Sequence, residues 1–325
     1  MKFCFIGSGM LARRVAGQLL KSGRHEIASV WSRNPKTAKE FAEKFGAKQC
    51  DSLEQAITSP EVEGVYIVTP HSAHYEHVKR ALLLNKPVLC EKAFTINALQ
   101  AEKLAELAKK QNTLLCEAMW TWFNPNIQKA LEIVKSGELG KVKSISAKLC
   151  FSDKFRAIFE KRPRFYDLNY GAGSLLDVGV YPIAFSYLFL GMPESITCEM
   201  KMWHGFDEYD KMVMSYSGGA KCRLAASYRK IESETAVIEM EKGKVIVPFF
   251  HKARKVKVKS ASSTKVYSFT GGYVHEFDQF EKDYRAGRTE SSIISLSQTI
   301  DIMKLMDECR RQNDFVYPEQ IEKVD

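Results

Sequence analysis

Residues 2–6, KFCFI, are a short apolar segment that runs directly into the glycine-rich turn GSGMLA. Gly7 stands where a tight turn is needed, Gly9 where the backbone approaches a pyrophosphate, and Ala12 where helix and strand pack closely. An amphipathic segment follows, and the N-terminus of a helix there would point its N–H groups and partial positive charge at the phosphates. The pattern predicts a dinucleotide-binding strand–turn–helix unit. The nucleotide contacts expected from this unit are Gly7, Gly9, Met10 and Leu11.

Strand and helix signals alternate over residues 1–120. Apolar segments such as EGVYIVT (63–69) and PVLCEK (87–92) have the length of buried strands, and segments such as ALQAEKLAELAKK (98–110) have helical periodicity. Such alternation indicates βαβ units, which form a parallel sheet with right-handed crossovers. We therefore predict an α/β fold whose first domain, residues 1–120, is a Rossmann-type doubly wound parallel sheet that binds the nucleotide.

The pattern changes after residue 120. Helices are predicted at about 125–136, near 177–190 and at about 291–312, whereas FTGGYVHEF (269–277) is expected to be a loop. The strands come in close succession, several of them joined by glycine-bearing turns. They predict a large, mainly antiparallel open sheet in an α+β domain over residues 121–325. The predicted strands are KVKSISAKLCF, SITCEMKMW, DKMVMSYS, KCRLAASYR, TAVIEME and KVIVPFF.

Composition restricts the class of protein. The eight cysteines are scattered singly without CxxC spacing, so neither a disulfide framework nor a zinc site is expected. Unpaired thiols in apolar strands fit a reducing cytosol. No apolar run approaches the roughly 18 residues of a membrane span, and no signal peptide precedes the first strand. The cytoplasm is therefore the expected location, with no membrane partner.

The formal charge of +9 is consistent with nucleic-acid binding or with an enzyme that handles anionic ligands. The densest basic segment, HKARKVKVKS at 251–260, alternates Lys or Arg with Ala and Val. This alternation is typical of one solvated face of a strand rather than of a binding groove. We therefore expect a basic enzyme with a small-molecule substrate and no nucleic-acid partner.

The end of the second strand predicts which nucleotide binds. An NAD enzyme usually has Asp or Glu there to hold the ribose 2′-hydroxyl, whereas a nearby Arg accommodates the 2′-phosphate of NADP. This strand ends in VWSRNPK, which offers Ser32, Arg33 and Lys36 and no acid. A hydroxyl and a guanidinium bind a phosphate that a carboxylate would repel, so NADP(H) is the predicted cofactor.

Ligands of open α/β sheets bind beyond the carboxyl ends of the strands. EGVYIVTPHSAH and PVLCEKAF place a threonine, histidines and a Glu–Lys pair at this edge. His71, His74 and His77 do not share one helical face, and no carboxylate completes a ligand set, so no metal site is predicted. The cofactor contacts expected here are Thr69, His71, His74, Glu91 and Lys92.

The segment GAGSLLDVGVYP, residues 171–182, contains a candidate acid–base group. If it is helical from about residue 177, Asp177 and Tyr181 lie one turn apart on one face. Oxidising an alcohol needs a hydride acceptor and a base, and a nearby lysine ammonium lowers the pKa of tyrosine from its usual value of about 10. Lys92 and Tyr181 fit this pairing, with Asp177 as an orienting group. A core tyrosine and a capping aspartate explain the spacing equally well.

The motifs GSGMLA, TPHSAH, EKA and GAGSLLDVGVYP, in this order along both halves, resemble those of the glucose–fructose oxidoreductase/inositol dehydrogenase superfamily (Gfo/Idh/MocA). Within it, EAMWTWFNP (117–125) and DVGVYP (177–182) are most similar to dimeric dihydrodiol dehydrogenases and NADP-dependent D-xylose dehydrogenases. The resemblance implies that Lys92 is the catalytic lysine. It also implies that Tyr181, four residues after Asp177, acts as acid/base where many relatives have histidine.

The resemblance further implies a homodimer, or a tetramer, formed through the open face of the C-terminal sheet. Such an interface would bury the apolar face of strands like VIVPFF, which otherwise have too little helix to cover them. The second domain is therefore expected to bind the substrate and to mediate oligomerisation.

Aromatic residues near these motifs are expected to line the substrate site, because a flat apolar wall suits a planar diol ring or the apolar face of a sugar. The subgroup often has Arg at the position of Trp122, so a positive charge is missing there. The expected wall comprises Trp120, Trp122, Phe123, Phe151, Phe155 and Tyr166, with Tyr181 as a further substrate contact.

The sequence thus predicts an NADP-dependent dehydrogenase that transfers a hydride between a vicinal diol (a trans-dihydrodiol), or an aldose such as D-xylose, and the nicotinamide. The alternative is a non-catalytic protein of the same fold that senses NADP or a sugar, as a galactose-regulon repressor of this architecture does. A sensor needs no acid–base residue, so the set Lys92, Asp177 and Tyr181 favours the enzyme.

Overall fold

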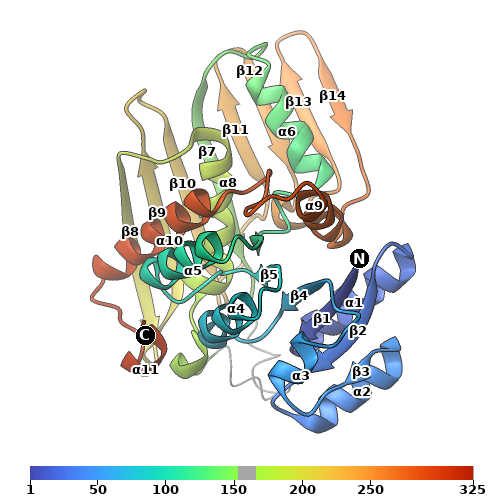
Figure 1. Ribbon diagram of the computed structural model, residues 1–325. Helices are drawn as coiled ribbons and strands as arrows, with labels where there is room; N and C mark the ends of the chain where they lie inside the picture. The colour runs from blue at the N-terminus through green and yellow to red at the C-terminus, as the bar shows by residue number, and fades with distance from the viewer. Residues whose placement is uncertain (153–165, 325) are drawn as a thin grey trace. The chain divides into compact units, whose positions relative to one another are not determined.

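The computed structural model describes residues 1–152 and 166–324 (Figure 1). Its contacts divide the chain into two compact units. The first contains Met1–Trp120, Gly272–Ile300 and Ile321–Asp325, and the second contains Thr121–Gly271 and Asp301–Gln320. Two later segments of the chain therefore belong with the first unit, and a single division at residue 120 does not separate the two units.

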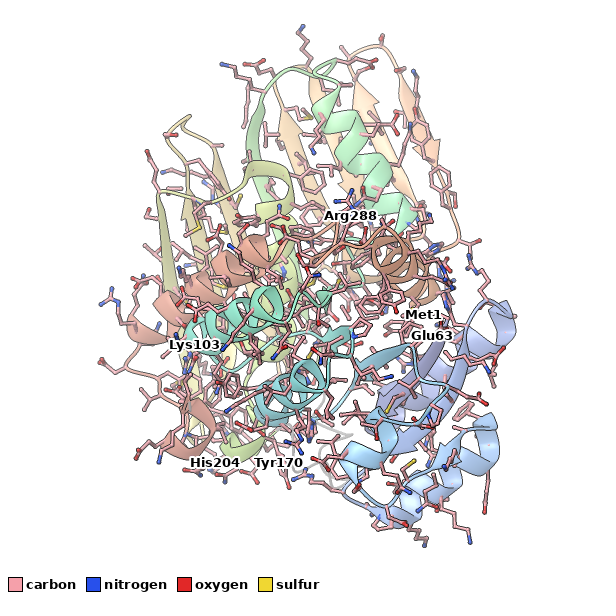
Figure 2. The ribbon with its side chains drawn as sticks, viewed as in Figure 1. Met1, Glu63, Lys103, Tyr170, His204 and Arg288 are labelled. Atoms are coloured by element: carbon pink, nitrogen blue, oxygen red, sulfur yellow. The ribbon has the colours of Figure 1, made fainter. Side chains whose placement is uncertain are left out.

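The first unit contains a six-stranded parallel sheet. Its strands are β1 (Lys2–Ile6), β2 (Glu26–Trp31), β3 (Lys48–Gln49), β4 (Gly64–Ile67), β5 (Val88–Glu91) and β6 (Leu115–Ala118). They are arranged in the order β3-β2-β1-β4-β5-β6. The order reverses between β1 and β4, and ligands of such sheets bind at the carboxyl ends of the strands at this point. At the opposite, amino end, Met1 and Glu63 lie side by side (Figure 2), where the Lys2 N–H donates to Glu63 Oε2 at 2.8 Å.

Helices connect these strands, and local residues cap several of them. They are α1 (Met10–Ser22), α2 (Pro35–Phe45), α3 (Leu53–Ile57), a 3₁₀ turn η1 (His71–Ala73) with α4 (His74–Leu83), and α5 (Ala98–Lys110). The side chains of Asn34, Ser52 and Asn97 accept backbone N–H bonds at the N-termini of α2, α3 and α5. Gly23 and Gly46 end α1 and α2 with left-handed φ values. The predicted alternation of strand and helix is therefore confirmed.

Helix α9 (Val274–Arg285) packs onto the same sheet. Phe277 is fully buried and meets the Phe3 ring edge-on, with ring centroids 4.9 Å apart. Asp278 Oδ1 lies 3.0 Å from His25 Nε2. The expectation of a loop in FTGGYVHEF is wrong from Val274 onward, because apolar residues at every third position form a helical face that packs on β1.

The second unit contains an eight-stranded sheet. Its strands are β7 (Val142–Cys150), β8 (Ser195–Trp203), β9 (Phe206–Ser215), β10 (Lys221–Ser227), β11 (Ala236–Met240), β12 (Gly243–Val247), β13 (Val256–Ser260) and β14 (Thr264–Tyr267). Their order is β14-β13-β12-β11-β7-β10-β9-β8. β10 is parallel to β7, and all other neighbours are antiparallel. The prediction of a large, mainly antiparallel sheet is confirmed, and β7 joins its two halves.

Helices pack on this sheet. α6 (Pro125–Lys135) lies across β12 and β13 (Figure 1), and α8 (Val180–Leu190) packs against β7 and β10. α10 (Leu296–Arg311) begins at Leu296 rather than near residue 291. The reason is a reciprocal cap, because the Ser295 N–H donates to Gln298 Oε1 at 2.9 Å and the Gln298 N–H donates to Ser295 Oγ at 3.3 Å. The short helical elements of this unit are η3 (Leu168–Tyr170), η5 (Phe250–Lys252) and α11 (Glu319–Glu322).

One stretch of the second unit, Leu168–Leu190, has the length and apolar composition of a membrane-spanning helix. The sequence pattern does not predict a span there, because polar residues such as Asn169 and Asp177 interrupt the apolar run. In the structure, 72% of its apolar window is buried inside the protein, as is typical of a core helix. This stretch therefore contains α8, the core helix that packs on the sheet.

Phe277→Ala tests the packing of α9 on the first unit. Removal of the buried ring is expected to lower the free energy of unfolding by about 3–5 kcal/mol, because it leaves a cavity beside Phe3. Chemical denaturation followed by circular dichroism measures the change. The matched control is Tyr284→Ala, at a ring of the same helix that is 39% exposed, which should change the value by no more than about 0.5 kcal/mol. Equal losses in the two variants would contradict this packing.

Candidate active site

The glycine-rich turn after β1 contains two glycines that are needed for different reasons. Gly7 has a φ of +115°, and a Cβ there would lie 2.6 Å from the carbonyl oxygen of Val68, so the fold itself requires glycine. Gly9 caps α1 with an ordinary φ of −70°, and a Cβ there would meet none of the described atoms within 4 Å. Neither strain nor packing explains Gly9. In the dinucleotide-binding motif, glycine at this position leaves room for a pyrophosphate at the helix N-terminus.

Hydrogen bonds tie this turn to the start of α2. Ser8 Oγ lies 2.8 Å from Thr37 Oγ1. Arg13 donates from Nε to the Ser8 carbonyl and from Nη2 to the Thr37 carbonyl, each at 3.2 Å. These bonds hold the loop after β2 beside the glycine-rich turn. The side chains predicted to bind phosphate on this loop are Ser32, which is half-buried, and Arg33 and Lys36, which are exposed.

His77, which the sequence pattern offers only as a rejected metal ligand, lies at the ends of β2 and β4. Its Nδ1 is 3.2 Å from Thr69 Oγ1, and its ring meets the Trp31 ring edge-on at 5.7 Å. Burial, followed by the influence of His74 and Arg33, lowers the pKa of His77 to about 4. A neutral imidazole therefore stands beside the predicted contact Thr69. In the sequence, His77 is visible only as the third histidine of the segment TPHSAHYEH.

His74 braces two loops at the carboxyl edge of the sheet. Its Nε2 lies 3.0 Å from the Thr69 carbonyl oxygen, and its Nδ1 lies 3.0 Å from the Ala93 carbonyl oxygen. Burial lowers the pKa of this fully buried ring to about 4. His74, expected to contact the cofactor, is therefore engaged by the protein itself. His71 is half-buried and lies edge-on to it at 5.7 Å.

β5 ends in Glu91, and the next residue is Lys92; the two are 3% and 8% exposed. In the parallel pair β4–β5, Tyr66 stands opposite Leu89, so Tyr66 and Glu91 point to the same face of the sheet. Tyr66 donates its hydroxyl to Glu91 Oε1 at 2.5 Å, and burial raises the pKa of Tyr66 well above its usual value. The peptide bond between Lys92 and Ala93 is cis. A buried ammonium and a hydrogen-bonded carboxylate therefore stand at the carboxyl end of β5.

Two further buried carboxyl groups influence this edge, and neither was predicted. Thr299 Oγ1 donates to Glu117 Oε2 at 2.9 Å, yet burial, with a further contribution from Glu91, raises the pKa of Glu117 to about 7. Glu276 of α9 is fully buried, and neither of its carboxyl oxygens has a hydrogen-bond partner among the described residues. Burial and then Glu91 raise the pKa of Glu276 well above its usual value. The raised pKa favours the neutral form of Glu276 beside the Glu91 carboxyl group.

In the second unit, the predicted segment begins as a π-helical turn, Leu175–Gly179, that carries Asp177 and continues into α8 with Tyr181. The Tyr228 hydroxyl, directly after β10, lies 2.8 Å from Asp177 Oδ2 and 3.1 Å from the Gly173 carbonyl oxygen. Asp177 therefore lies inside the helical segment and does not cap it. Tyr181 is 8% exposed, and its ring centroid lies 6.2 Å from that of His251.

The aromatic residues expected to form a wall are divided between the two units. In the first, Trp120 stacks on Tyr273 with ring centroids 4.6 Å apart. In the second, Trp122 is 1% exposed and stacks on Tyr187 at 6.4 Å, so it is a core residue rather than an open part of a wall. Of the others, Phe123 is buried, Phe151 packs on Tyr228, Tyr166 contacts Trp203 and Phe206, and Phe155 lies outside the described residues.

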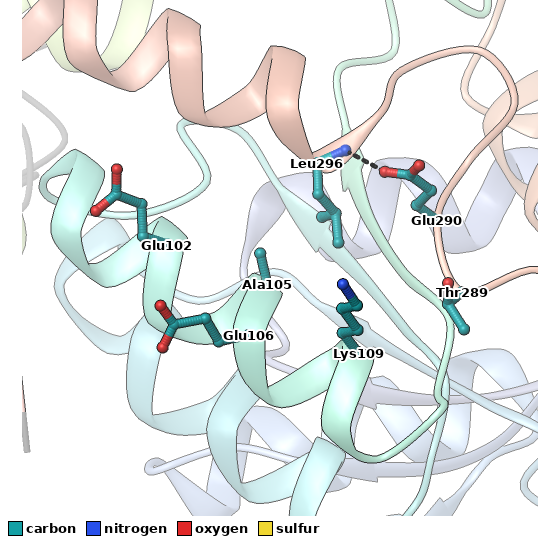
Figure 3. A pocket seen from close by; sticks show the side chains of 7 residues that line it. All are labelled: Glu102, Ala105, Glu106, Lys109, Thr289, Glu290 and Leu296. Carbon is teal, nitrogen blue, oxygen red and sulfur yellow. Dashed lines mark hydrogen bonds between the residues drawn. The ribbon is translucent and has the colours of Figure 1, made fainter.

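A cavity of about 500 Å³ lies elsewhere on the first unit, between α5 and the segment that precedes α10 (Figure 3). At its rim the Leu296 N–H donates to Glu290 Oε2 at 2.9 Å. Its lining residues are Glu102, Ala105, Glu106, Lys109, Thr289, Glu290 and Leu296. None of them is a predicted site residue. Within residues 1–152 and 166–324, no group of three or more His, Cys, Asp or Glu residues is suited to hold a metal ion.

The strand order and the glycine-rich turn define the first unit as a dinucleotide-binding Rossmann domain. Residues 1–118 match the Gfo/Idh/MocA family described as "Oxidoreductase family, NAD-binding Rossmann fold". Residues 127–246 match the Gfo/Idh/MocA C-terminal domain. The chain belongs to the Gfo/Idh/MocA family of oxidoreductases, as its motifs predicted.

Relatives of known activity cover almost the whole chain. The D-xylose 1-dehydrogenase (NADP+) of Hypocrea jecorina is 31% identical, over 92% of this chain and 86% of the relative. The trans-1,2-dihydrobenzene-1,2-diol dehydrogenase of Mus musculus is 26% identical, over 98% of both chains. A 3-ketoreductase from Actinomadura kijaniata, solved with NADP and TDP-benzene, superposes with a TM-score of 0.84 at 21% identity, over 96% of this chain and 97% of that one. The last of these shows the shared fold.

Gly9→Ala tests whether this glycine serves a ligand. The variant is expected to bind NADPH at least about tenfold more weakly, a loss of about 1.4 kcal/mol, because the added methyl group occupies the path of the pyrophosphate. Fluorescence titration of NADPH measures the affinity, and thermal denaturation of the free protein should show an unchanged Tm. Gly7→Ala is the contrasting variant, which should lower the Tm of the free protein. Unchanged NADPH affinity in Gly9→Ala would refute the assignment.

Proposed function

We propose that this chain is an NADP-dependent oxidoreductase that transfers a hydride between a hydroxyl-bearing carbon and the nicotinamide ring. The proposed donors are vicinal diols of the trans-dihydrodiol type and aldoses such as D-xylose, in keeping with the names of the relatives. The observation that carries the proposal is the carboxyl edge of the first sheet. This edge holds both Gly9, with open space at the N-terminus of α1, and the buried Lys92 beside Glu91.

NADP is the proposed cofactor rather than NAD. The loop after β2 carries Ser32, Arg33 and Lys36 and no carboxylate, and Arg33 and Lys36 are exposed. These side chains suit a 2′-phosphate, which a carboxylate at this position would repel. Other proposed cofactor contacts are Gly7, Gly9, Met10, Leu11, Thr69, His71, Glu91 and Lys92.

In the proposed mechanism, a bound nicotinamide would supply the acceptor for the hydride that leaves the substrate C–H bond. The hydroxyl proton passes to Tyr181 as phenolate, and the Lys92 ammonium stabilises this phenolate and lowers the pKa of the tyrosine. Asp177, which is held by Tyr228, orients the substrate or the lysine. In the reverse direction Tyr181 returns the proton to the carbonyl oxygen. Trp120 and Phe151 are the proposed aromatic contacts of the substrate.

The second unit is proposed to mediate a homodimer or tetramer through its sheet. Large apolar side chains in and just after its last strand are open to solvent, with Val266 of β14 56% exposed and Phe269 44% exposed. Burial of such side chains against a second copy is favourable. The cytoplasm remains the proposed location, and support comes from all eight cysteines being buried and free.

Arg33→Asp tests the choice of cofactor. The change removes the cation for the 2′-phosphate and adds a repelling charge, so the ratio of kcat/KM for NADP+ to that for NAD+ should fall at least about a hundredfold, or about 2.7 kcal/mol. Steady-state kinetics with both cofactors measures the ratio. Arg24→Asp, at an exposed arginine of the same unit that pairs with Asp278, is the charge-matched control. A preference for NADP+ that survives Arg33→Asp would show the assignment to be wrong.

Reduction of NADP+ followed by absorbance, over a panel of trans-dihydrodiols, aldopentoses, aldohexoses and inositols, tests the reaction itself. Turnover of a panel member should fall at least about a hundredfold in Lys92→Met, because an acid–base group is lost, while NADPH binding is retained. Lys110→Met, at an exposed lysine that ends α5, is the control. Tight NADPH binding without turnover of any panel member would favour a sensor of the same fold.

A further inference from the structure

A bulge in β9 brings two acidic residues to the same face of the second sheet. In the antiparallel pair β8–β9, Tyr209 stands opposite Lys201 and Asp207 stands opposite Met202, so Glu208 has no opposite residue. Asp207 and Asp210 are three positions apart, and in a regular strand they would point to opposite faces. The extra residue reverses the alternation between them, as bulges do beside functional sites. Both carboxyl groups consequently reach the same hydroxyl, that of Ser174.

Both hydrogen bonds at this hydroxyl are satisfied when one of the two carboxyl groups carries a proton. Ser174 Oγ lies 3.3 Å from Asp207 Oδ2 and is also hydrogen-bonded to Asp210 Oδ2. A serine hydroxyl carries one hydrogen and can donate only once. If it donates to Asp207, the bond to Asp210 needs a protonated Asp210 as donor. The Leu175 N–H also donates to Asp207 Oδ2, at 2.5 Å, so Asp207 is the acceptor of the pair.

The surroundings of the pair favour one proton rather than none. Asp207, Asp210 and Ser174 are fully buried, and the second carboxyl oxygen of each aspartate has no hydrogen-bond partner among the described residues. Burial raises the pKa of Asp207 to about 6, and burial together with the Asp207 charge raises the pKa of Asp210 well above its usual value. Titratable groups near the pair include Cys198 of β8, Cys150 of β7 and Tyr228 with its partner Asp177, and Cys309 and Tyr317 lie behind them. Each of these groups is neutral or acidic.

The pair touches the first residues of the segment on which the proposed reaction depends. Ser174 and Leu175 begin the π-helical turn that carries Asp177, and this turn continues into α8 with Tyr181. Gly173 permits the approach, because a Cβ there would collide with the Asp207 carboxyl group. From the other side, Tyr228 holds Asp177. The start of the segment is therefore held by β9. Its acidic side chain, Asp177, is held by Tyr228 at the end of β10.

We propose that Asp207 and Asp210 are positioning residues that share one proton and thereby fix the helical segment that carries Asp177 and Tyr181. The inference rests on the proposed roles of those two residues in hydride transfer. The neutral form of Asp210 is the one that the fold favours, since its pKa is raised on folding. Its contribution to stability is therefore complete at low pH and is lost as the pH rises through the pKa of the folded state. In alkaline solution two buried charges repel each other and the segment loosens.

Asp210→Asn separates this role from ordinary packing. The amide keeps the size of the acid, donates to Ser174 and never ionises, so it imitates the protonated form. Wild type should lose stability relative to Asp210→Asn as the pH rises, up to about tenfold in the unfolding equilibrium for each pH unit. Turnover in Asp210→Asn should stay within about threefold of wild type at pH 7 and extend to higher pH. Asp210→Leu, which cannot donate, should lose kcat at least tenfold with the KM for NADP+ unchanged. Asp51→Asn, at an exposed acid, is the control.

Three outcomes overturn the proposal. Parallel loss of stability with pH in wild type and Asp210→Asn would show that the pair holds no proton. Full kcat in a folded Asp210→Leu would show that the position of the segment with Asp177 and Tyr181 does not depend on the Asp210 carboxyl group. A Tm that falls in EDTA and recovers with Ca²⁺ would show that a cation, and not a proton, neutralises the pair. If wild type turns over no panel substrate, the proposed function fails, whereas the comparison of unfolding still tests the shared proton.

Discussion

A buried carboxyl group needs either a hydrogen-bond donor or a proton, and both units of this protein are arranged around that requirement. In the first, Tyr66 supplies the donor to Glu91 at the end of β5, and Thr299 supplies one to Glu117. In the second, Ser174 and the Leu175 N–H serve Asp207. Since each donor comes from a different element than its acid, these bonds also join strands and helices at the places where the candidate catalytic residues stand.

The fold of each unit was largely predictable, because parallel strands alternating with helices and antiparallel strands joined by glycine turns leave local patterns. The features that were not predicted depend on contacts between residues far apart in the sequence. Phe277 packs on Phe3 near the other end of the chain, and no local turn signal announces that residues after Gly272 return to the first sheet. The spacing of Val274, Phe277 and Phe280 did contain a helical signal for α9, but the neighbouring glycines outweighed it.

Of the candidate site, the sequence identified residues whose chemistry is carried by a motif. Gly7 and Gly9 are examples, since both belong to one contiguous glycine-rich motif, and the left-handed φ of Gly7 is a local requirement. Tyr66, Tyr228 and Glu276 were missed because their roles depend on strand register, on the residue after a strand, and on a helix from a distant segment. Trp122 shows the opposite case, in which a residue expected to contact the substrate is buried. An aromatic residue beside a motif resembles a substrate contact, and only its burial against Tyr187 reveals a core residue.

The position of β7 between β10 and β11 has a consequence for the order of assembly. β8 to β10 and β11 to β14 are each made of neighbours in the chain, so each set can form from local contacts. β7 emerges before all of them during synthesis, yet it lies in the middle of the finished sheet. Its apolar residues Ile145, Ala147 and Leu149 must wait for partners that are synthesised much later. Pairing of β7 with β10 and β11 is therefore the non-local step in forming this sheet. Such steps are slow and leave strand edges open to aggregation until they are complete.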